Sequence, residues 1–139
     1  MANLDFIVFE LEGGRYALDI SVVKEVVELK PIMPVPETPD YVVGLINLRG
    51  EVLPVIDIKQ RLRLTPLEPD EATKIIVVEN TDYKAGLLVE SLPRVHRAES
   101  EDINREPSTV KPKIEMEMVA GVLEEDYTVI LNLDRVLQA

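Results

Sequence analysis

Short runs of valine, isoleucine and leucine recur along this chain, and each run stops at a glycine, a proline or a polar turn. The first run, 6–11, precedes Gly13-Gly14, a pair that can adopt the positive φ angles of a tight hairpin. Val and Ile together number 30, whereas Ala numbers only 7. Because β-branched side chains suit pleated sheets and Ala is the best helix former, these proportions favour sheet. The sequence therefore predicts an all-β chain with only short helices.

The other extended segments follow from the same alternation of apolar runs and turns. A second hairpin is predicted over 44–58, with its turn at Arg49-Gly50. Pro54 cannot donate a ladder hydrogen bond, so we expect its strand to lie at a sheet edge or to be bulged there. The remaining predicted strands are 15–20, 74–79, 84–89, 94–98, 118–123 and 129–133.

Few helices are expected, and two stretches read as irregular. Residues 22–27 carry apolar side chains at helical spacing but are β-branched, so we expect a brief helix that runs into a strand near Val26, with Asp19 or Ser21 as its cap. Single helical turns are expected at 59–62 and after Asp134, which could cap the second one. Irregular chain is expected at 31–39, which holds four prolines, and in the polar segment 99–113, which holds Pro107 and Pro112.

The two halves of the chain resemble each other. Residues 6–10 match 75–79 at a spacing of 69. At a spacing of 77, Gly44-Leu45-Ile46 matches Gly121-Val122-Leu123, Val52-Leu53 matches Val129-Ile130, and Ile56-Asp57 matches Leu133-Asp134. We interpret residues 1–139 as one domain made of two similar five-stranded units, small barrels or sandwiches, over roughly 6–58 and 75–134. The sequence does not determine which strands pair between the halves.

Charge and missing residue types restrict the function. Acids outnumber bases by 26 to 15, and a net charge of −11 repels phosphate backbones and anionic lipid, so we expect no nucleic-acid partner. Cys is absent and His96 is the one histidine, so no metal, cofactor or catalytic centre is expected. An enzyme that uses carboxylates is an alternative, but no convincing acid–base pair supports it. The chain shows neither a secretory signal nor an apolar stretch near the ~18 residues of a membrane span, so we expect a cytoplasmic protein without membrane insertion.

The most distinctive stretch is 38–57, which reads TPDYVVGLINLRGEVLPVID. It closely resembles the signature of CheW-like proteins, the chemotaxis coupling family of bacteria and archaea. The resemblance extends to the phenylalanine-containing strand and the YALDI segment within 6–25, to the GLLV segment 86–89, and to 121–134. It thus covers nearly the whole chain, and we expect a stand-alone coupling protein without an attached kinase or receiver domain.

The resemblance implies a fold, partners and a location. Family members consist of two five-stranded, SH3-like β-barrels and have no catalytic activity. They join the histidine kinase CheA to the cytoplasmic tips of methyl-accepting chemotaxis receptors, in arrays at the inner face of the membrane. The kinase is met barrel to barrel, and the receptor hairpin is held in a groove.

The same resemblance implies site residues. Ile7, Ile20 and Val23 match apolar residues that face the kinase, although ordinary core packing is an open alternative for Ile7 and Ile20. Glu25 and Arg49 match polar residues tied to partner contact, and Asn47 and Gly50 flank Arg49 in the motif. No role is inferred for the segment 99–113.

Two other functions keep this type of fold. A paralogous CheW-like scaffold could serve surface motility or another receptor–kinase pathway, and the sequence does not separate it from a chemotaxis adaptor. A generic SH3-like module could bind peptides, but such grooves are rich in aromatic side chains. Aromatic residues make up 4% of this chain and Trp is absent, which argues against a peptide-binding module.

Overall fold

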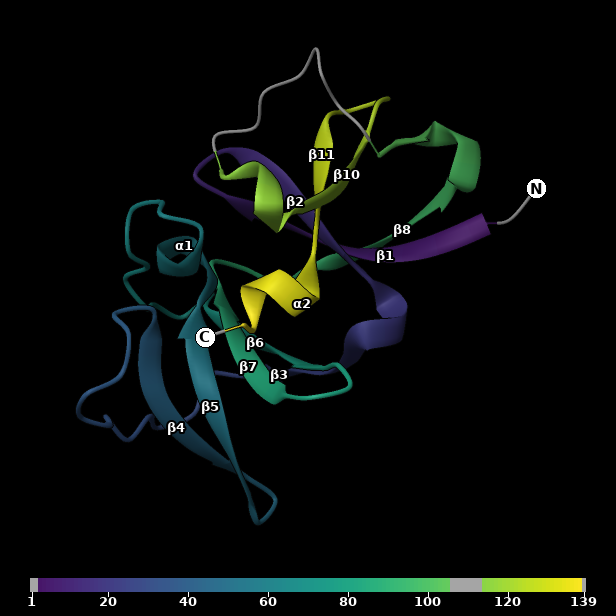
Figure 1. Cartoon of the computed structure of the whole chain (residues 1–139). Helices are drawn as coiled ribbons and strands as arrows, with labels where there is room; N and C mark the ends of the chain where they lie inside the picture. Colours follow the sequence, from purple (N-terminus) through teal and green to yellow (C-terminus); the bar gives the residue numbers. More distant parts are fainter. Residues whose placement is uncertain (1–2, 106–113, 139) are drawn as a thin grey trace.

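The computed structural model describes residues 3–105 and 114–138. Two curled β-sheets lie one above the other, with the C-terminal helix between them (Figure 1). The six-stranded sheet has the order β8 (Arg94–Glu99), β1 (Asn3–Leu11), β2 (Gly14–Asp19), β11 (Thr128–Leu131), β10 (Val119–Leu123), β9 (Ile103–Asn104). The five-stranded sheet has the order β3 (Val23–Glu28), β6 (Lys74–Glu79), β7 (Lys84–Val89), β5 (Glu51–Asp57), β4 (Val42–Leu48). The helical turns are η1 (Ile20–Val22), α1 (Ile58–Arg61), η2 (Ser100–Asp102), η3 (Met116–Met118) and α2 (Leu133–Val136).

The predicted all-β class with short helices is confirmed, and each sheet takes strands from both halves of the chain. After β2 the chain leaves the six-stranded sheet through η1 and enters the other sheet as β3. After β7 it crosses in the opposite direction and enters as β8. Apart from the two-residue β9, the two sheets therefore share one strand order, with the first-half and second-half strands interchanged.

Strand register shows how closely the two halves correspond. Ile7 pairs with Leu18 in the first hairpin and Ile76 pairs with Leu87 in its counterpart, which keeps the spacing of 69. The predicted spacing of 77 is wrong for the last strand of each half. Val55 pairs with Gly44, and Ile130 pairs with Gly121. Val55 and Ile130 are therefore the equivalent residues of the last strands, and they are 75 positions apart in the sequence. The reason is that the second of these hairpins is two residues shorter than the first between the paired positions.

The apolar core has three layers. One lies inside the five-stranded sheet, one lies inside the six-stranded sheet, and the largest lies between the two sheets. In β1, Phe6 and Val8 face the inner layer of their own sheet, whereas Ile7 and Phe9 face the layer between the sheets. Both faces of β1 are therefore buried, which explains why its sequence is an unbroken apolar run rather than an alternating one.

Two predictions near the start of the chain need correction. The first turn consists of Glu12 and Gly13, both with positive φ, and Gly14 already belongs to β2. The brief helix expected to run into a strand near Val26 is only the three-residue η1, and the strand already begins at Val23; η1 is capped by Asp19, one of the two expected caps. The following valines form β3, because pairing with β6 offers these β-branched side chains a pleated surface.

Three further expectations differ from the structure. The cap of α2 is Asn132, and Asp134 lies in the first turn of that helix. Pro54 lies in an interior strand, but pairing of β5 with β7 begins only at Val55, so this proline has no ladder partner on that side. The segment 99–113 begins with η2 and β9 rather than loop, and its part 106–113 lies outside the described residues.

The proline-rich segment 31–39 forms an antiparallel bridge with β4. The backbone N–H and C=O of Met33 both bond to Leu45, at 2.8 Å each. A Cβ atom on Gly44 would lie 2.3 Å from the Met33 carbonyl oxygen, well inside van der Waals contact. Only glycine therefore fits here, and the resulting contact covers part of the outer edge of β4.

Two polar side chains organise the chain after β5. The buried carboxylate of Asp57 accepts hydrogen bonds from Lys59 N at 3.0 Å, Gln60 N at 3.4 Å and Leu67 N at 2.8 Å. It therefore caps α1 and fixes the loop that follows it. The mostly buried Lys59 ammonium lies 3.7 Å from carboxylate oxygens of both Glu12 and Glu90, which ties the first turn of one sheet to the end of β7 in the other.

Candidate protein-interaction site

The turn between β4 and β5 displays an arginine on a constrained backbone. Arg49 has φ 52° and Gly50 has φ 85°, the pair of positive angles that a two-residue hairpin turn of this twist requires. The side-chain oxygen of Asn47 accepts a hydrogen bond of 2.9 Å from Gly50 N, which fixes the turn from within. The Arg49 side chain is 68% exposed. Asn47 and Gly50 thus set the backbone that presents the guanidinium.

Arg49 is paired with a strand on the opposite edge of its sheet. Its guanidinium donates a hydrogen bond to the carboxylate of Glu25 on β3. Strands β3 and β4 are the outermost strands of the five-stranded sheet, so this ion pair connects the two edges. Four site residues predicted from the sequence therefore lie together: Glu25, Asn47, Arg49 and Gly50.

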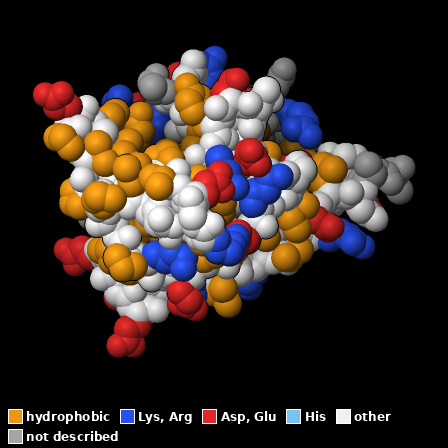
Figure 2. Space-filling model, turned by 90° about the horizontal axis from the view of Figure 1, so that it is seen from below, with side chains coloured by type: hydrophobic (Ala, Val, Ile, Leu, Met, Phe, Trp, Pro, Cys, Tyr) orange, Lys and Arg blue, Asp and Glu red, His pale blue; other side chains and the backbone are white. Residues whose placement is uncertain are grey.

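More charges lie at the same end of the five-stranded sheet. Lys84 Nζ is 2.7 Å from Glu51 Oε1, and Lys24 Nζ is 3.5 Å from Glu79 Oε1. Figure 2 views the molecule from the side of this sheet and shows acidic and basic side chains next to one another, with hydrophobic side chains exposed around them. Val52, beside the Arg49 turn, is one of the exposed apolar residues. The surface therefore combines ordered charges with apolar area.

The pKa values of the central pair follow from their contact. The hydrogen bond from Arg49 is the main cause that lowers the pKa of the Glu25 carboxyl, and Glu25 in turn raises the pKa of Arg49. Ion pairs on an exposed surface add little to folding stability. The pair is therefore better explained as a device that orients two side chains than as a device that stabilises the fold.

The apolar site residues predicted from the sequence do not all lie on the surface. Ile20 is 38% exposed on η1, and Val23 is partly buried against the layer between the sheets. Ile7 is 7% exposed and belongs to that layer, so its own side chain offers almost no contact area. Val95, which pairs with Ile7 from the edge strand β8, is 63% exposed. The sequence does not reveal this exposure, since an Arg-Val-His-Arg run does not show which side of an edge strand is covered.

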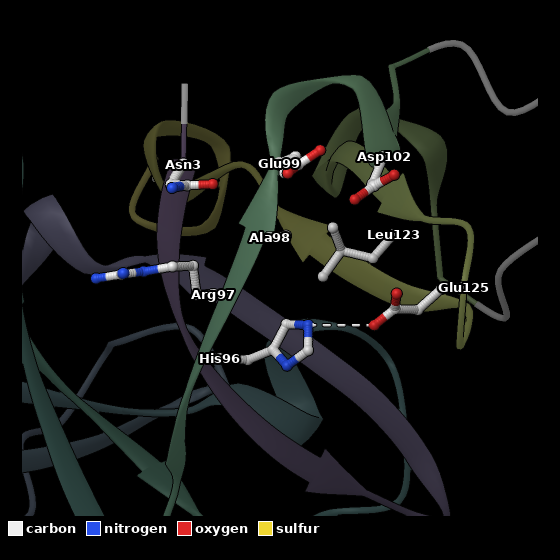
Figure 3. Close-up of a pocket in the computed structure, with 8 residues that line it drawn as sticks. All are labelled: Asn3, His96, Arg97, Ala98, Glu99, Asp102, Leu123 and Glu125. Carbon is white, nitrogen blue, oxygen red and sulfur yellow. Dashed lines mark ion pairs between the residues drawn. The ribbon is translucent and has the colours of Figure 1, made fainter. Parts of the chain in front are cut away.

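A hollow of about 510 Å³ lies in the other sheet, beside β8. It is lined by Asn3, His96, Arg97, Ala98, Glu99, Asp102, Leu123 and Glu125 (Figure 3). His96 points toward Glu125, with Nε2 3.5 Å from Oε1. Among residues 3–105 and 114–138, no group of three or more His, Asp and Glu side chains could hold a metal ion. The arrangement fits a solvated strand histidine and adds nothing to the interaction site.

None of the helices in the described part of the chain is long and apolar enough to cross a membrane.

One consequence of the Arg49–Glu25 pair can be measured without any partner. Replacing Arg49 by alanine removes the main cause that lowers the pKa of Glu25, so this pKa should rise toward the ordinary value of 4.5. In the parent protein the ion pair persists above pH 4.5 and is lost as the pH falls through the lowered pKa of Glu25. An NMR pH titration of the Glu25 carboxyl carbon in both proteins checks this, and identical titration curves would contradict it.

Comparisons with known proteins give the family. The CheW-like domain model matches residues 5–139. The chain is 32% identical to the chemotaxis protein CheW of Treponema pallidum, over 95% of this chain and 79% of that protein. It is 30% identical to the chemotaxis protein CheW of Helicobacter pylori, over 97% of this chain and 82% of that protein. The crystal structure of the scaffolding protein TtCheW from Thermoanaerobacter tengcongensis superposes with a TM-score of 0.90 at 32% identity, over 99% of this chain and 94% of that one. The chain therefore belongs to the CheW-like domain family.

Proposed function

We propose that this protein is a non-enzymatic adaptor that couples methyl-accepting chemotaxis receptors to a CheA-type histidine kinase. Family membership and the likeness to a solved scaffolding protein support a chemotaxis scaffold. The observation that carries the finer proposal is the exposed arginine turn. Arg49 stands on a backbone fixed by Asn47 and Gly50, it is oriented by Glu25, and it lies in the stretch that resembles the signature of coupling proteins.

Two neighbouring parts of the surface would take part in partner contact. Ile20 and Val23, on the segment that crosses from one sheet to the other, would meet the kinase together with Glu25. Ile7 is buried beneath this region, so it would act on the kinase surface only through packing. The arginine turn would contact the receptor, the kinase or both. Arginine is enriched among interface residues that contribute most to binding, which suits this position.

Coupling between the partners is then a property of binding free energies. If receptor binding changes the affinity for the kinase, kinase binding must change the affinity for the receptor by the same factor. The protein would act in the cytoplasm, recruited to receptor arrays at the inner face of the membrane.

Reconstitution tests the proposal. The protein is mixed with the CheA-type kinase and a receptor cytoplasmic fragment from its own organism, and co-sedimentation and kinase autophosphorylation are measured with and without it. We expect receptor control of the kinase only when the protein is present. A folded protein that binds neither partner would refute the proposal and favour a paralogous receptor–kinase pathway. A kinase that responds fully to the receptor without the protein would also refute it.

A further inference from the structure

We propose that Glu51 and Lys84 are positioning residues for Arg49: the Lys84 ammonium holds the Glu51 carboxylate, which leaves the Arg49 guanidinium directed at Glu25. This inference rests on the proposed role of the arginine turn in partner binding. Neither residue belongs to the Asn47–Gly50 turn, and Lys84 lies 35 residues beyond Arg49 in the sequence.

Four charges from different parts of the five-stranded sheet meet at its end. Glu25 comes from β3, Arg49 from the turn, Glu51 from the first position of β5 and Lys84 from the first position of β7. Strands β5 and β7 are parallel neighbours, so both strand starts lie at the same end of the sheet. The result is two ion pairs side by side, Arg49–Glu25 and Lys84–Glu51.

Arg49 is influenced by both acids of this group, and Glu25 is influenced by both bases. Glu51 contributes to raising the pKa of Arg49, after the larger effect of Glu25. Lys84 contributes to lowering the pKa of Glu25, after the larger effect of Arg49. An exchanged arrangement, with Arg49 on Glu51 and Lys84 on Glu25, would also pair opposite charges. The interaction that favours Arg49–Glu25 with Lys84–Glu51 therefore determines the direction of the exposed Arg49 guanidinium.

Lys84 is the member of the group best placed to select the pairing. Its side chain is 30% exposed, against 68% for Arg49, so it has less freedom to reorient. Its Nζ lies 2.7 Å from Glu51, whereas the cross-strand neighbour Glu79 is already paired with Lys24. When Lys84 is paired with Glu51, Glu25 is the acid of this group that is left to pair with Arg49.

Positioning of Arg49 by Lys84 should raise the affinity for a partner rather than the stability of the fold. Exposed ion pairs contribute little to stability, so loss of Lys84 should leave the fold intact. Binding a mobile side chain costs conformational entropy, and a side chain held in its bound orientation avoids part of that cost. Without Lys84, the freed Glu51 carboxylate competes with Glu25 for the guanidinium.

A set of four variants tests the inference against the kinase and receptor fragment of the reconstitution. We expect Lys84→Met to weaken binding by about threefold to tenfold and Lys84→Arg to restore it. The double variant Lys84→Met/Glu51→Gln should bind within about twofold of the parent, because it contains neither competing charge. Lys74→Met is the matched control: it breaks a pair with Glu28 of 3.0 Å elsewhere on the same sheet and should not change binding. Unchanged binding by Lys84→Met, or a double variant that binds more weakly than Lys84→Met, would overturn the inference.

A partner-free measurement separates this inference from the proposed function. In NMR spectra of the whole protein, the Nη2 hydrogens of Arg49, which bond to Glu25, should exchange with water faster in Lys84→Met than in the parent, and recover in the double variant. If the parent protein binds neither partner but this pattern holds, the proposed function fails while the positioning of Arg49 stands. Equal exchange rates in all variants would refute the positioning even if the reconstitution succeeds.

Discussion

Arg49→Ala should fold like the parent protein and bind its partners roughly tenfold to a hundredfold more weakly. The side chain is mostly exposed, and its ion pair with Glu25 contributes little to folding, so thermal unfolding should be almost unchanged. The turn itself should persist, because Asn47 bonds to the backbone of Gly50 rather than to the arginine side chain. Titration calorimetry with the kinase and with the receptor fragment measures the loss for each partner separately.

The matched control is Arg63→Ala. Arg63 also has a positive φ, 62°, and also forms an exposed ion pair, 2.9 Å from Glu115. It lies after α1, away from the arginine turn, so its removal should leave both affinities as they are. Equal affinity of Arg49→Ala and the parent for both partners would remove Arg49 from the interaction site. Equal losses in both variants would show a general effect of surface charge instead.

Asp57→Ala should destabilise the fold more than any change in the arginine turn, by about 2–4 kcal/mol of unfolding free energy. The carboxylate is buried and accepts hydrogen bonds from three backbone N–H groups, one of them from the loop ten residues later. Alanine would leave those donors without a partner in a region that water does not reach freely. Urea unfolding followed by far-UV circular dichroism measures the change.

Asp57→Asn distinguishes the two parts of this role. One amide oxygen can still accept from Lys59 N and Gln60 N, but the amide nitrogen cannot accept from Leu67 N. We therefore expect a smaller loss than for alanine. Asp134→Ala is the comparison, since Asp134 lies in the first turn of α2 without capping it. A loss below about 0.5 kcal/mol for Asp57→Ala would contradict the capping role.

Hairpins could be predicted from the sequence because their signals are local. The bounds of β6 and β7 agree with the expected 74–79 and 84–89, since a polar turn separates two apolar runs of strand length. The exchange of strands between the sheets could not be predicted, because any apolar strand in one half suits several neighbours in the other. The same problem affected 22–27, where pairing with β6 outweighed the helical spacing.

In the candidate site, too, the sequence predicted some features, whereas others depend on the fold. Its residues were found through the resemblance of 38–57 to a known family, but the contact between Arg49 and Glu25 joins residues 24 positions apart and needs the fold. Burial of Ile7 also needs the fold: an unbroken apolar run does not show which side chains face another layer of the core. Lys84 carries no local signal, since it is one lysine at the start of an ordinary strand.

The exchange of strands also sets the order in which the molecule can be completed during biosynthesis. Every strand of the five-stranded sheet has been made by Val89, whereas Tyr16 of β2 pairs with Val129, near the end of the chain. The β1–β2 hairpin, although made first, must therefore wait for almost the whole polypeptide to leave the ribosome before its sheet can close. Pairing over such sequence separations is slow. Until β11 arrives, the completed sheet can cover only the face of β1 that carries Ile7 and Phe9, while the face with Phe6 and Val8 still lacks its partner Ile130.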